Sequence, residues 1–494
     1  MTKYLVYSNT GLSSRQIGLT AEFIETIKGD VIELKVVMCN GVLENCYFNP
    51  LHNSMACASC QSRSHQLLKE IGISKKDILS LKEYDFEFEL PFFNSLEELL
   101  DFKFEGINIG RGVASSIISY YRDYHVTSRK YGDIIELECK KSINVLYNFQ
   151  KIIGQENPAK VVLFNGRFSE IYPLLEYCRS IDLDFVSLES GAKGTYELFE
   201  NSLPHSIRYR HKSMLELWGK ELKNIDKNTI AHEWFKKKRY RDDSIEISFT
   251  KNQKLNALPS NFDSNKNNVL ILNSSEDEMK VIEEFYTELF DTQNEAIEKI
   301  ILHFANNSET HFYLRVHPNL GKVDNVQMRE IEKFDFPNLT VIGPNELIDT
   351  YAIMMACDKS IVFGSTSGIE ATYWGKASIL LGKSFYYYIK DTCYKPQSFE
   401  ELYSLISTEN LSPKSQEACL PYGYYFSTYG IKTKYFEYKG LNNSTFKGKR
   451  IKKWYPSTFL YAVRYLFQSR KWAKAYRAAL GKRLRLTDLF RYKI

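Results

Sequence analysis

Two short stretches in the second half of the chain combine residue types that suit phosphate binding. Residues 312–320 have the pattern of a hydrophobic strand that ends in His317 followed by Pro318. Residues 359–382 begin as a short apolar strand, pass through the glycine, serine and threonine turn 364–368, and continue as a helix. Such a turn exposes N–H groups and hydroxyls to a phosphate, and an imidazole on a stiff His-Pro turn can donate to it. Together the two stretches predict a nucleotide-sugar pocket.

The residues around these stretches define a predicted donor site. We expect His317 to hydrogen-bond the donor phosphate, with Arg315 nearby as charge support. The hydroxyls of the turn would add donors, and two serines after an earlier strand could reach the same place. A capping box with Glu278 is the alternative interpretation of Ser275. The predicted donor-binding residues are Arg315, His317, Pro318, Ser274, Ser275, Ser365, Thr366, Ser367 and Glu370.

These motifs resemble the bacterial capsule and surface-polysaccharide glycosyltransferases of the GT-B architecture. The His-Pro motif is shared by Kdo transferases and bacterial sialyltransferases, and residues 341–379 are the most similar stretch. Residues 163–191 look like the family's Asn-Gly-Arg segment, and 269–278 look like the opening of its second half. The resemblance implies two doubly wound Rossmann-like domains facing a cleft, and a contact between Glu370 and the donor ribose. A carboxylate stabilising a helix N-terminus is the alternative for Glu370.

Polar residues also follow two predicted strands in the first half of the chain. Asn165 and Arg167 come directly after one strand, and Glu189 lies at the end of the next, 184–190. Polar residues at strand ends are candidates for the acceptor side of a cleft. Inverting sugar transfer needs a base that deprotonates the acceptor hydroxyl, so we predict Glu189 and His317 as the catalytic residues. An ion pair with Arg167 is the alternative interpretation of Glu189.

Four cysteines between residues 39 and 60 have a spacing that is typical of metal sites. Cys57 and Cys60 form a Cys-x2-Cys pair, and Cys39 and Cys46 precede them. Two thiolates on one turn can bind one metal ion, and a second pair completes a tetrahedron. Thiolate-only sites favour zinc or an iron–sulfur cluster, and unliganded thiols are the third possibility. We expect a structural zinc, with an iron–sulfur cluster as the alternative, and no cofactor for the transfer chemistry itself.

The charge of the chain is unevenly distributed. The 494 residues are 44% hydrophobic and 25% charged, as in folded proteins. Residues 441–494 contain 15 Lys and Arg but only one acidic residue, Asp488, so the rest of the chain is acidic. Phe459, Ala462, Val463, Leu466 and Phe467 would share one face of a basic helix, so residues 446–494 suit an anionic membrane surface. A helix packed on the protein's own acidic body is the alternative. Nucleic acid is not an expected partner, because no binding motif is present.

Strand and helix patterns alternate along both halves, which predicts an α/β fold with mainly parallel sheets. The polar stretch 251–267 separates an N-terminal acceptor-side Rossmann-like domain, 1–250, from a nucleotide-sugar domain, 268–440. A basic helical tail, 441–494, would follow, and a long helix is expected over 276–306. We expect a cytoplasmic protein, because no signal peptide and no run of about 18–20 apolar residues is visible.

The resemblance implies a metal-independent glycosyltransferase that builds capsule or lipopolysaccharide at the cytoplasmic face of the bacterial inner membrane. Its donor would be a CMP- or UDP-linked sugar, and its acceptor a glycan or lipid-linked glycan. Two alternatives remain. One is a nucleotide-sugar epimerase on the same fold, which would use the same pocket without an acceptor. The other is a non-catalytic, metal-stabilised scaffold of a polysaccharide assembly complex.

Overall fold

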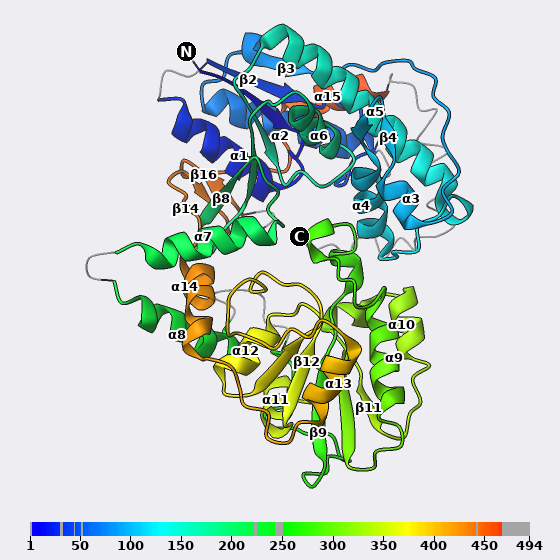
Figure 1. The fold of residues 1–494 in the computed structure, drawn as a ribbon. Coiled ribbons are helices and arrows are strands. Elements are labelled where there is room, and N and C mark those ends of the chain that lie inside the picture. The colour runs from blue at the N-terminus through cyan, green and yellow to red at the C-terminus, as the bar shows by residue number, and fades with distance from the viewer. Residues whose placement is uncertain are drawn as a thin grey trace. The chain divides into compact units, whose positions relative to one another are not determined.

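The chain forms two compact α/β units, which Figure 1 shows coloured along the sequence. The computed structural model describes residues 2–29, 33–43, 45–50, 53–221, 225–242, 250–440 and 443–466. Unit 1 takes its described residues from 1–121, 125–204 and the chain after 430, and unit 2 consists of 122–124 and 205–429.

Unit 1 is built on a seven-stranded sheet with the order β14-β8-β7-β6-β1-β2-β3. Its strands are β1 (Lys3–Ser8), β2 (Glu33–Met38), β3 (Ile78–Ser80), β6 (Lys160–Phe164), β7 (Phe185–Ser190), β8 (Thr195–Glu200) and β14 (Ile431–Lys432). The five strands from β7 to β3 are parallel, whereas β8 is antiparallel to both of its neighbours. The central strands are almost entirely apolar because both faces of a parallel sheet are covered.

Helices cover both faces of the unit 1 sheet. They are α1 (Ser14–Ile27), α2 (Ser54–Glu70), α3 (Leu96–Leu100), α4 (Gly110–Tyr121), α5 (Ser128–Glu156), α6 (Tyr172–Ser180) and α15 (Ser457–Leu466). Side chains of β1 alternate between two cores. Val6 packs with residues of α1 and α2, while Leu5 and Tyr7 pack with residues of α5 and α6.

The chain returns to unit 1 after residue 430. There β14 joins the sheet, and a small antiparallel sheet of β15 (Phe436–Glu437), β16 (Thr445–Phe446) and β17 (Lys449–Arg450) follows. The buried carboxylate of Glu22 on α1 accepts hydrogen bonds from the backbone N–H groups of residues 434, 435 and 436, at 2.7 to 2.9 Å. Phe436 packs against α1 at Gly18, where a Cβ would lie 2.2 Å from its ring. The returning segment is therefore part of the unit 1 core.

Unit 2 is built on a five-stranded, fully parallel sheet with the order β11-β10-β9-β12-β13. Its strands are β9 (Asn267–Leu272), β10 (Thr310–Arg315), β11 (Leu339–Ile342), β12 (Lys359–Val362) and β13 (Ala377–Leu380). Its α-helices are α7 (Ile207–Gly219), α8 (Lys227–Arg239), α9 (Gln293–His303), α10 (Val326–Ile331), α11 (Thr350–Ala356), α12 (Ser367–Tyr373), α13 (Phe399–Ser407) and α14 (Leu420–Thr428). A mainly parallel sheet in unit 1 and a fully parallel one in unit 2 confirm the predicted α/β class with two doubly wound units.

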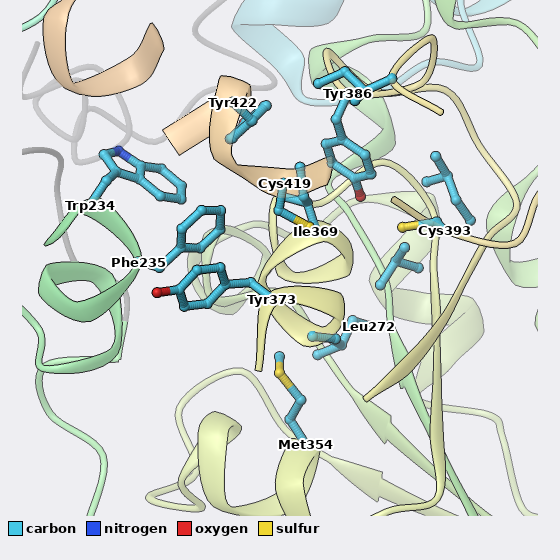
Figure 2. Packing of buried hydrophobic residues seen from close by; sticks show 14 of the residues in the cluster. Trp234, Phe235, Leu272, Met354, Ile369, Tyr373, Tyr386, Cys393, Cys419 and Tyr422 are labelled. Carbon is cyan, nitrogen blue, oxygen red and sulfur yellow. The ribbon is translucent and has the colours of Figure 1, made fainter. Parts of the chain in front are cut away.

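An aromatic cluster joins α8, α12 and α14 in the core of unit 2 (Figure 2). The rings of Phe235 and Tyr373 stack with centroids 3.8 Å apart, and Trp234 meets Tyr422 edge to face at 5.5 Å. This packing explains why the division of the chain differs from the expected boundaries at 250 and 440. Helices α7 and α8 precede the second sheet in sequence, but their residues Met214, Ala231, Trp234 and Phe235 are buried in the core of unit 2.

The segment after β9 also differs from the expected helix over 276–306. Two 3-10 turns, η2 (Glu276–Glu278) and η3 (Glu283–Phe285), come first, and α9 begins only at Gln293. Thr292 caps α9 by accepting from the N–H of Glu295. The expected helix is therefore wrong over residues 276–292. Among the helices that the structure describes, none combines the length and apolar character of a bilayer span.

Candidate functional site

The carboxyl edge of the unit 2 sheet has the topology of a ligand site. β9 lies between β10 and β12, and the chain order reverses between β9 and β12. Loops leaving the two strands at such a reversal diverge, and open α/β sheets bind their ligands there. Residues 273–275 follow β9, and residues 363–367 follow β12. Both predicted serine motifs therefore belong to this edge.

The loop after β9 contains buried polar atoms that suit a ligand. Asn273 is 2% exposed, and its Oδ1 accepts from the backbone N–H of His317 at 2.8 Å. Within the part of the chain that the structure describes, Asn273 Nδ2 and Ser274 Oγ have no hydrogen-bond partner in the protein. Buried polar atoms in this state are satisfied by water or by a bound molecule. Sequence reasoning found Ser274 but missed Asn273, whose only signal was its place directly after a buried strand.

His317 is a neutral hydrogen-bond donor in this structure. Its Nδ1 accepts from the backbone N–H of Asn319 at 3.2 Å. Burial, and then the positive charges of Arg122 and Arg315, lower the pKa of His317 to about 4, although Asp277 acts in the opposite direction. The imidazole is therefore uncharged at pH 7. Because Nδ1 acts as an acceptor, the proton of the ring lies on Nε2.

Arg122 is a site residue that the sequence did not reveal. It lies between α4 and α5, outside any motif, with a left-handed φ of 51°. Its guanidinium forms an ion pair with Asp277 and donates to Ser275 Oγ at 2.8 Å. Ser275 Oγ in turn donates to Asp277 at 2.7 Å. The hydroxyl of Ser275 is thus used within the protein, and it does not cap the following turn, so the alternative capping box with Glu278 is wrong.

Arg315 and Pro318 support the site from within the protein. Arg315 is 3% exposed and donates to the backbone carbonyls of Gly343 at 2.5 Å and Glu346 at 3.1 Å. Burial lowers the pKa of Arg315, but its ordinary value is so high that the charge remains. Its donors therefore hold the loop after β11, and its positive charge lowers the pKa of His317. Pro318 is half-buried and opens the 3-10 turn that follows His317.

The glycine and serine turn after β12 is tightly formed. Gly364 has a φ of 126°, and a Cβ there would lie 2.9 Å from the carbonyl of Lys383. Ser365 Oγ lies 3.0 Å from Ser367 Oγ and accepts from the N–H of Ser367 at 3.2 Å. These serines and Thr366 are half-buried, so part of each remains accessible. The predicted helix follows as α12, which has only seven residues.

Glu370 lies in the first turn of α12 and is 4% exposed. Its carboxylate accepts a hydrogen bond from the hydroxyl of Tyr351. Burial, and then the charge of Glu370, raise the pKa of the Tyr351 phenol well above its ordinary value, so the phenol keeps its proton. One carboxylate oxygen is thus occupied within the protein. The expected contact between Glu370 and ribose stays a prediction.

In unit 1 the chain order reverses between β1 and β6. The predicted acceptor residues Asn165 and Arg167 follow β6, and Glu189 lies near the end of β7. Asn165 Nδ2 donates to Glu189 Oε2 at 2.8 Å, and the half-buried Glu189 also accepts from the N–H of Ser190. Arg167 donates to Ser119 at 3.3 Å. The structure therefore brings Asn165 and Glu189 together. The role of Glu189 as a base stays a prediction.

The loop after β1 is a second polar edge that sequence reasoning missed. Ser8, Asn9 and Thr10 are 3%, 7% and 3% exposed. Among the described residues, Ser8 Oγ, Asn9 Oδ1 and Thr10 Oγ1 find no hydrogen-bond partner in the protein. Like the loop after β9, this loop leaves the sheet where the chain order reverses. Its hydroxyls can both donate and accept, which suits a polyhydroxylated ligand.

A buried ionic network lies beside the segment that follows β6. Lys141 Nζ is 2.8 Å from Glu138 and 3.5 Å from Glu170, and all three side chains are almost fully buried. Burial acts to lower the pKa of Lys141, but the two carboxylates raise it above its usual value. Glu138 also accepts from Asn45 at 2.6 Å, and Glu170 accepts from the N–H of Tyr47 at 2.9 Å. The network fixes the loop of residues 45–47 against α5, and no sequence pattern marked it.

The four cysteines of the predicted metal site come from three places in unit 1. Cys39 follows β2, Cys46 lies in the next loop, and Cys57 and Cys60 lie on α2. Burial, and then the neighbouring thiol of Cys39, raise the pKa of Cys57 and Cys60 to about 12, which indicates that these thiols are close together. No three His, Cys, Asp or Glu side chains in the described parts of the chain are arranged to hold a metal ion. Zinc or cluster binding by these cysteines stays a prediction.

No protein-family model matches the chain, and no curated protein sequence matches it. Similar solved structures include the β-Kdo 2,4-transferase KpsC of Thermosulfurimonas dismutans, with 15% identity over 54% of this chain and 79% of that one and a TM-score of 0.35. The structure of S. aureus MnaA with UDP has 12% identity over 86% of this chain and 94% of that one, with a TM-score of 0.29. The UDP-GlcNAc 2-epimerase of Methanocaldococcus jannaschii has 10% identity over 85% of this chain and 98% of that one, with a TM-score of 0.25. Kdo transferases and epimerases therefore both appear, and likeness of this strength does not separate them.

Proposed function

We propose that this protein is a glycosyltransferase that binds a nucleotide sugar at the carboxyl edge of the unit 2 sheet. The observation that carries the proposal is the group of uncharged donors at the strand reversal. Asn273 Nδ2 and Ser274 Oγ lie in the loop after β9, the neutral His317 follows β10, and the half-buried serine turn follows β12. Preorganised donors of this kind stabilise the charge that develops on a leaving phosphate without a metal ion.

The electrostatics of the edge support an anionic ligand. Asp277, the carboxylate that faces His317 in this loop, is paired with Arg122. The pairing reduces the repulsion that an unpaired carboxylate would exert on a phosphate. The charge of Arg315 lies close enough to lower the pKa of His317, so it also favours a negative group there. The nucleotide of a CMP- or UDP-linked sugar has the required phosphate.

We further propose that unit 1 binds the acceptor and that Glu189 is the base. Glu189 would take the proton of the acceptor hydroxyl as the new glycosidic bond forms, and the sugar–phosphate bond would break with its electron pair leaving on the nucleotide. Asn165, which donates to Glu189 at 2.8 Å, would orient this carboxylate. The hydroxyl-bearing loop of residues 8–10 suits the sugar hydroxyls of a glycan. We infer that this glycan is a lipid-linked capsule or lipopolysaccharide precursor at the cytoplasmic membrane face.

Nucleotide binding and product analysis test this proposal. Purified protein is first screened by thermal shift against CMP, UDP, GDP and dTDP, and the nucleotide that stabilises it identifies the donor class. Ser274→Ala should weaken that shift, whereas the control Ser264→Ala, at an exposed position of the same unit, should not. The matching nucleotide sugar is then incubated with and without acceptor glycans. Conversion of the donor alone would identify an epimerase, and failure to bind any nucleotide would favour a scaffold.

The cysteine group is proposed as a separate structural metal site of unit 1. Cys39, Cys46, Cys57 and Cys60 supply four soft ligands, and a bound metal would deprotonate them in spite of their raised pKa values. Elemental analysis of protein purified without a histidine tag should find about one zinc per chain, or iron with visible absorbance for a cluster. Metal-free protein of full stability would refute this proposal and leave the transferase proposal untouched.

A further inference from the structure

Helix α15 has one face that is attached to unit 1. Ala462 is 7% exposed and packs on Ala58 of α2. On the same side, Thr458 Oγ1 and Ser62 Oγ share a hydrogen bond of 2.6 Å. The two helices lie side by side in Figure 1. This face of the helix therefore packs on the protein itself, which was the alternative to membrane binding that the sequence left open.

The opposite face of α15 is apolar and exposed. Phe459, Leu460 and Val463 are 73%, 71% and 36% exposed. At 100° per residue, the centre of these three positions lies on the side of the helix away from residues 458 and 462. The expected apolar stripe is thus divided, because Ala462 faces the protein whereas Phe459 and Val463 are exposed. Phe467 and the rest of the predicted basic tail lie outside the described residues. Neighbouring exposed apolar side chains of this size mark an interaction site more often than isolated ones do.

The segment that leads into α15 is basic and firmly held. Between residues 443 and 466 the chain has six Lys and Arg and no acidic residue. Lys452 and Lys453 are exposed, but their backbone carbonyls accept from Arg63 at 3.2 Å and Ser59 at 2.5 Å. Trp454 is 45% exposed beside them. Cationic and indole side chains are thus presented to solvent from a backbone that α2 fixes in place.

We propose that this surface, consisting of Lys449, Lys452, Lys453, Trp454 and the exposed face of α15, docks on an anionic lipid bilayer. Charge complementarity and apolar insertion act together at such an interface. No helix among the described residues has the length and apolar character of a bilayer span, so we expect α15 to lie in the plane of the interface. Nucleic acid would use the basic residues but would leave Leu460 and Val463 without a partner. The proposal is independent of the proposed transferase activity.

Vesicle flotation with the full chain tests the proposal. We expect the protein to float with vesicles of phosphatidylglycerol and phosphatidylcholine, and not with phosphatidylcholine alone. Phe459→Ser with Leu460→Ser should weaken binding at least tenfold, and Lys452→Gln with Lys453→Gln should weaken it mainly at low salt. The matched control is Tyr240→Ser with Leu255→Ser, at positions of unit 2 that are 76% and 69% exposed, and it should bind as the wild type does.

Two further measurements make the outcome decisive. The serine variant at 459 and 460 should keep the wild-type melting temperature and monomer mass, because both side chains are exposed. A lowered melting temperature would mean that another part of the chain covers this face. A changed mass in ultracentrifugation would mean that a second copy covers it. Either result overturns the proposal. So does flotation of the variant at the wild-type level, or failure of the wild-type protein to float. Nucleotide binding by the variant should be unchanged, which shows that the unit 2 site is unaffected.

Discussion

The loop after β9 in unit 2 and the loop after β1 in unit 1 occupy the same place in two similar sheets. Each leaves the sheet where the chain order reverses, and each contains buried polar side chains whose hydrogen bonds the described protein does not complete. They differ in their charges. In unit 2, Arg122, Asp277 and Arg315 lie around a neutral His317, whereas unit 1 pairs Lys141 with two carboxylates in its interior.

The different charges of the two edges suit two different kinds of ligand on the same sheet architecture. The unit 2 edge combines uncharged N–H and O–H donors with nearby cations, which suits a phosphate. The unit 1 edge presents hydroxyl and amide groups from Ser8, Asn9 and Thr10, which suit the hydroxyls of a sugar, and its buried cation Lys141 is paired with carboxylates. Four predictions test this comparison.

The largest effect is expected for the proposed base in unit 1. Glu189→Gln should reduce the transfer rate about 10²–10⁴-fold, because an amide cannot accept the acceptor proton. Nucleotide binding in unit 2 should be unchanged, as measured by thermal shift. The control Glu200→Gln, on the neighbouring strand and paired with Lys160 at 2.8 Å, should transfer at the wild-type rate. Full transfer by Glu189→Gln would remove this residue from the mechanism.

The second prediction concerns the buried charges of unit 1. Lys141→Met should lower the free energy of unfolding by about 3–5 kcal/mol, because it leaves two buried carboxylates without their cation. Urea denaturation measures this change. Lys140→Met is the matched control: it removes a partly exposed ion pair with Glu136, which contributes about 0–1 kcal/mol. Equal stability of the two variants would show that Lys141 does not stabilise the buried carboxylates of unit 1.

The third prediction concerns the neutral donor of unit 2. His317→Ala should weaken nucleotide binding about ten- to a hundredfold, the value of one hydrogen bond to a charged group. Isothermal titration calorimetry measures this affinity. His311→Ala is a suitable control, because His311 lies on the same strand but bonds Thr340 at 2.8 Å. A folded His317→Ala protein with wild-type affinity would contradict the assigned phosphate contact.

The last prediction is a pH dependence that His317 imposes on folding. Its pKa of about 4 in the folded protein lies below the ordinary 6.5, so between these values the unfolded chain binds more protons. This contribution to stability is complete above pH 6.5 and is lost as pH falls through 4. Between pH 6 and 8 nucleotide affinity should therefore not follow a histidine titration. His317→Gln should flatten the stability profile below pH 6.5, and an unchanged profile would contradict the lowered pKa.

The sequence was sufficient for those features that depend on local pattern. Buried strands such as β6 and β12, and the turn of residues 364–368, follow from apolar runs and small residues, and their place at a sheet edge follows from parallel topology. Arg122 was missed because its partner Asp277 is far away in the sequence, and the role of Lys141 depends on the burial of its pairs with Glu138 and Glu170, which no local pattern shows. The same limit applies to α8, since the stacking of Phe235 on Tyr373 places a polar-looking segment in the core of unit 2.

The return of the chain to unit 1 after residue 430 has a consequence for biosynthesis. A ribosome delivers the first five parallel strands of unit 1 early, but β14 and the segment that satisfies Glu22 only after all of unit 2 has emerged. At about 5–20 residues per second, the strand edge at β8 and a buried carboxylate then wait roughly ten seconds or longer for their partners. During that interval the nascent chain presents an unpaired sheet edge, which is the kind of surface that chaperones protect.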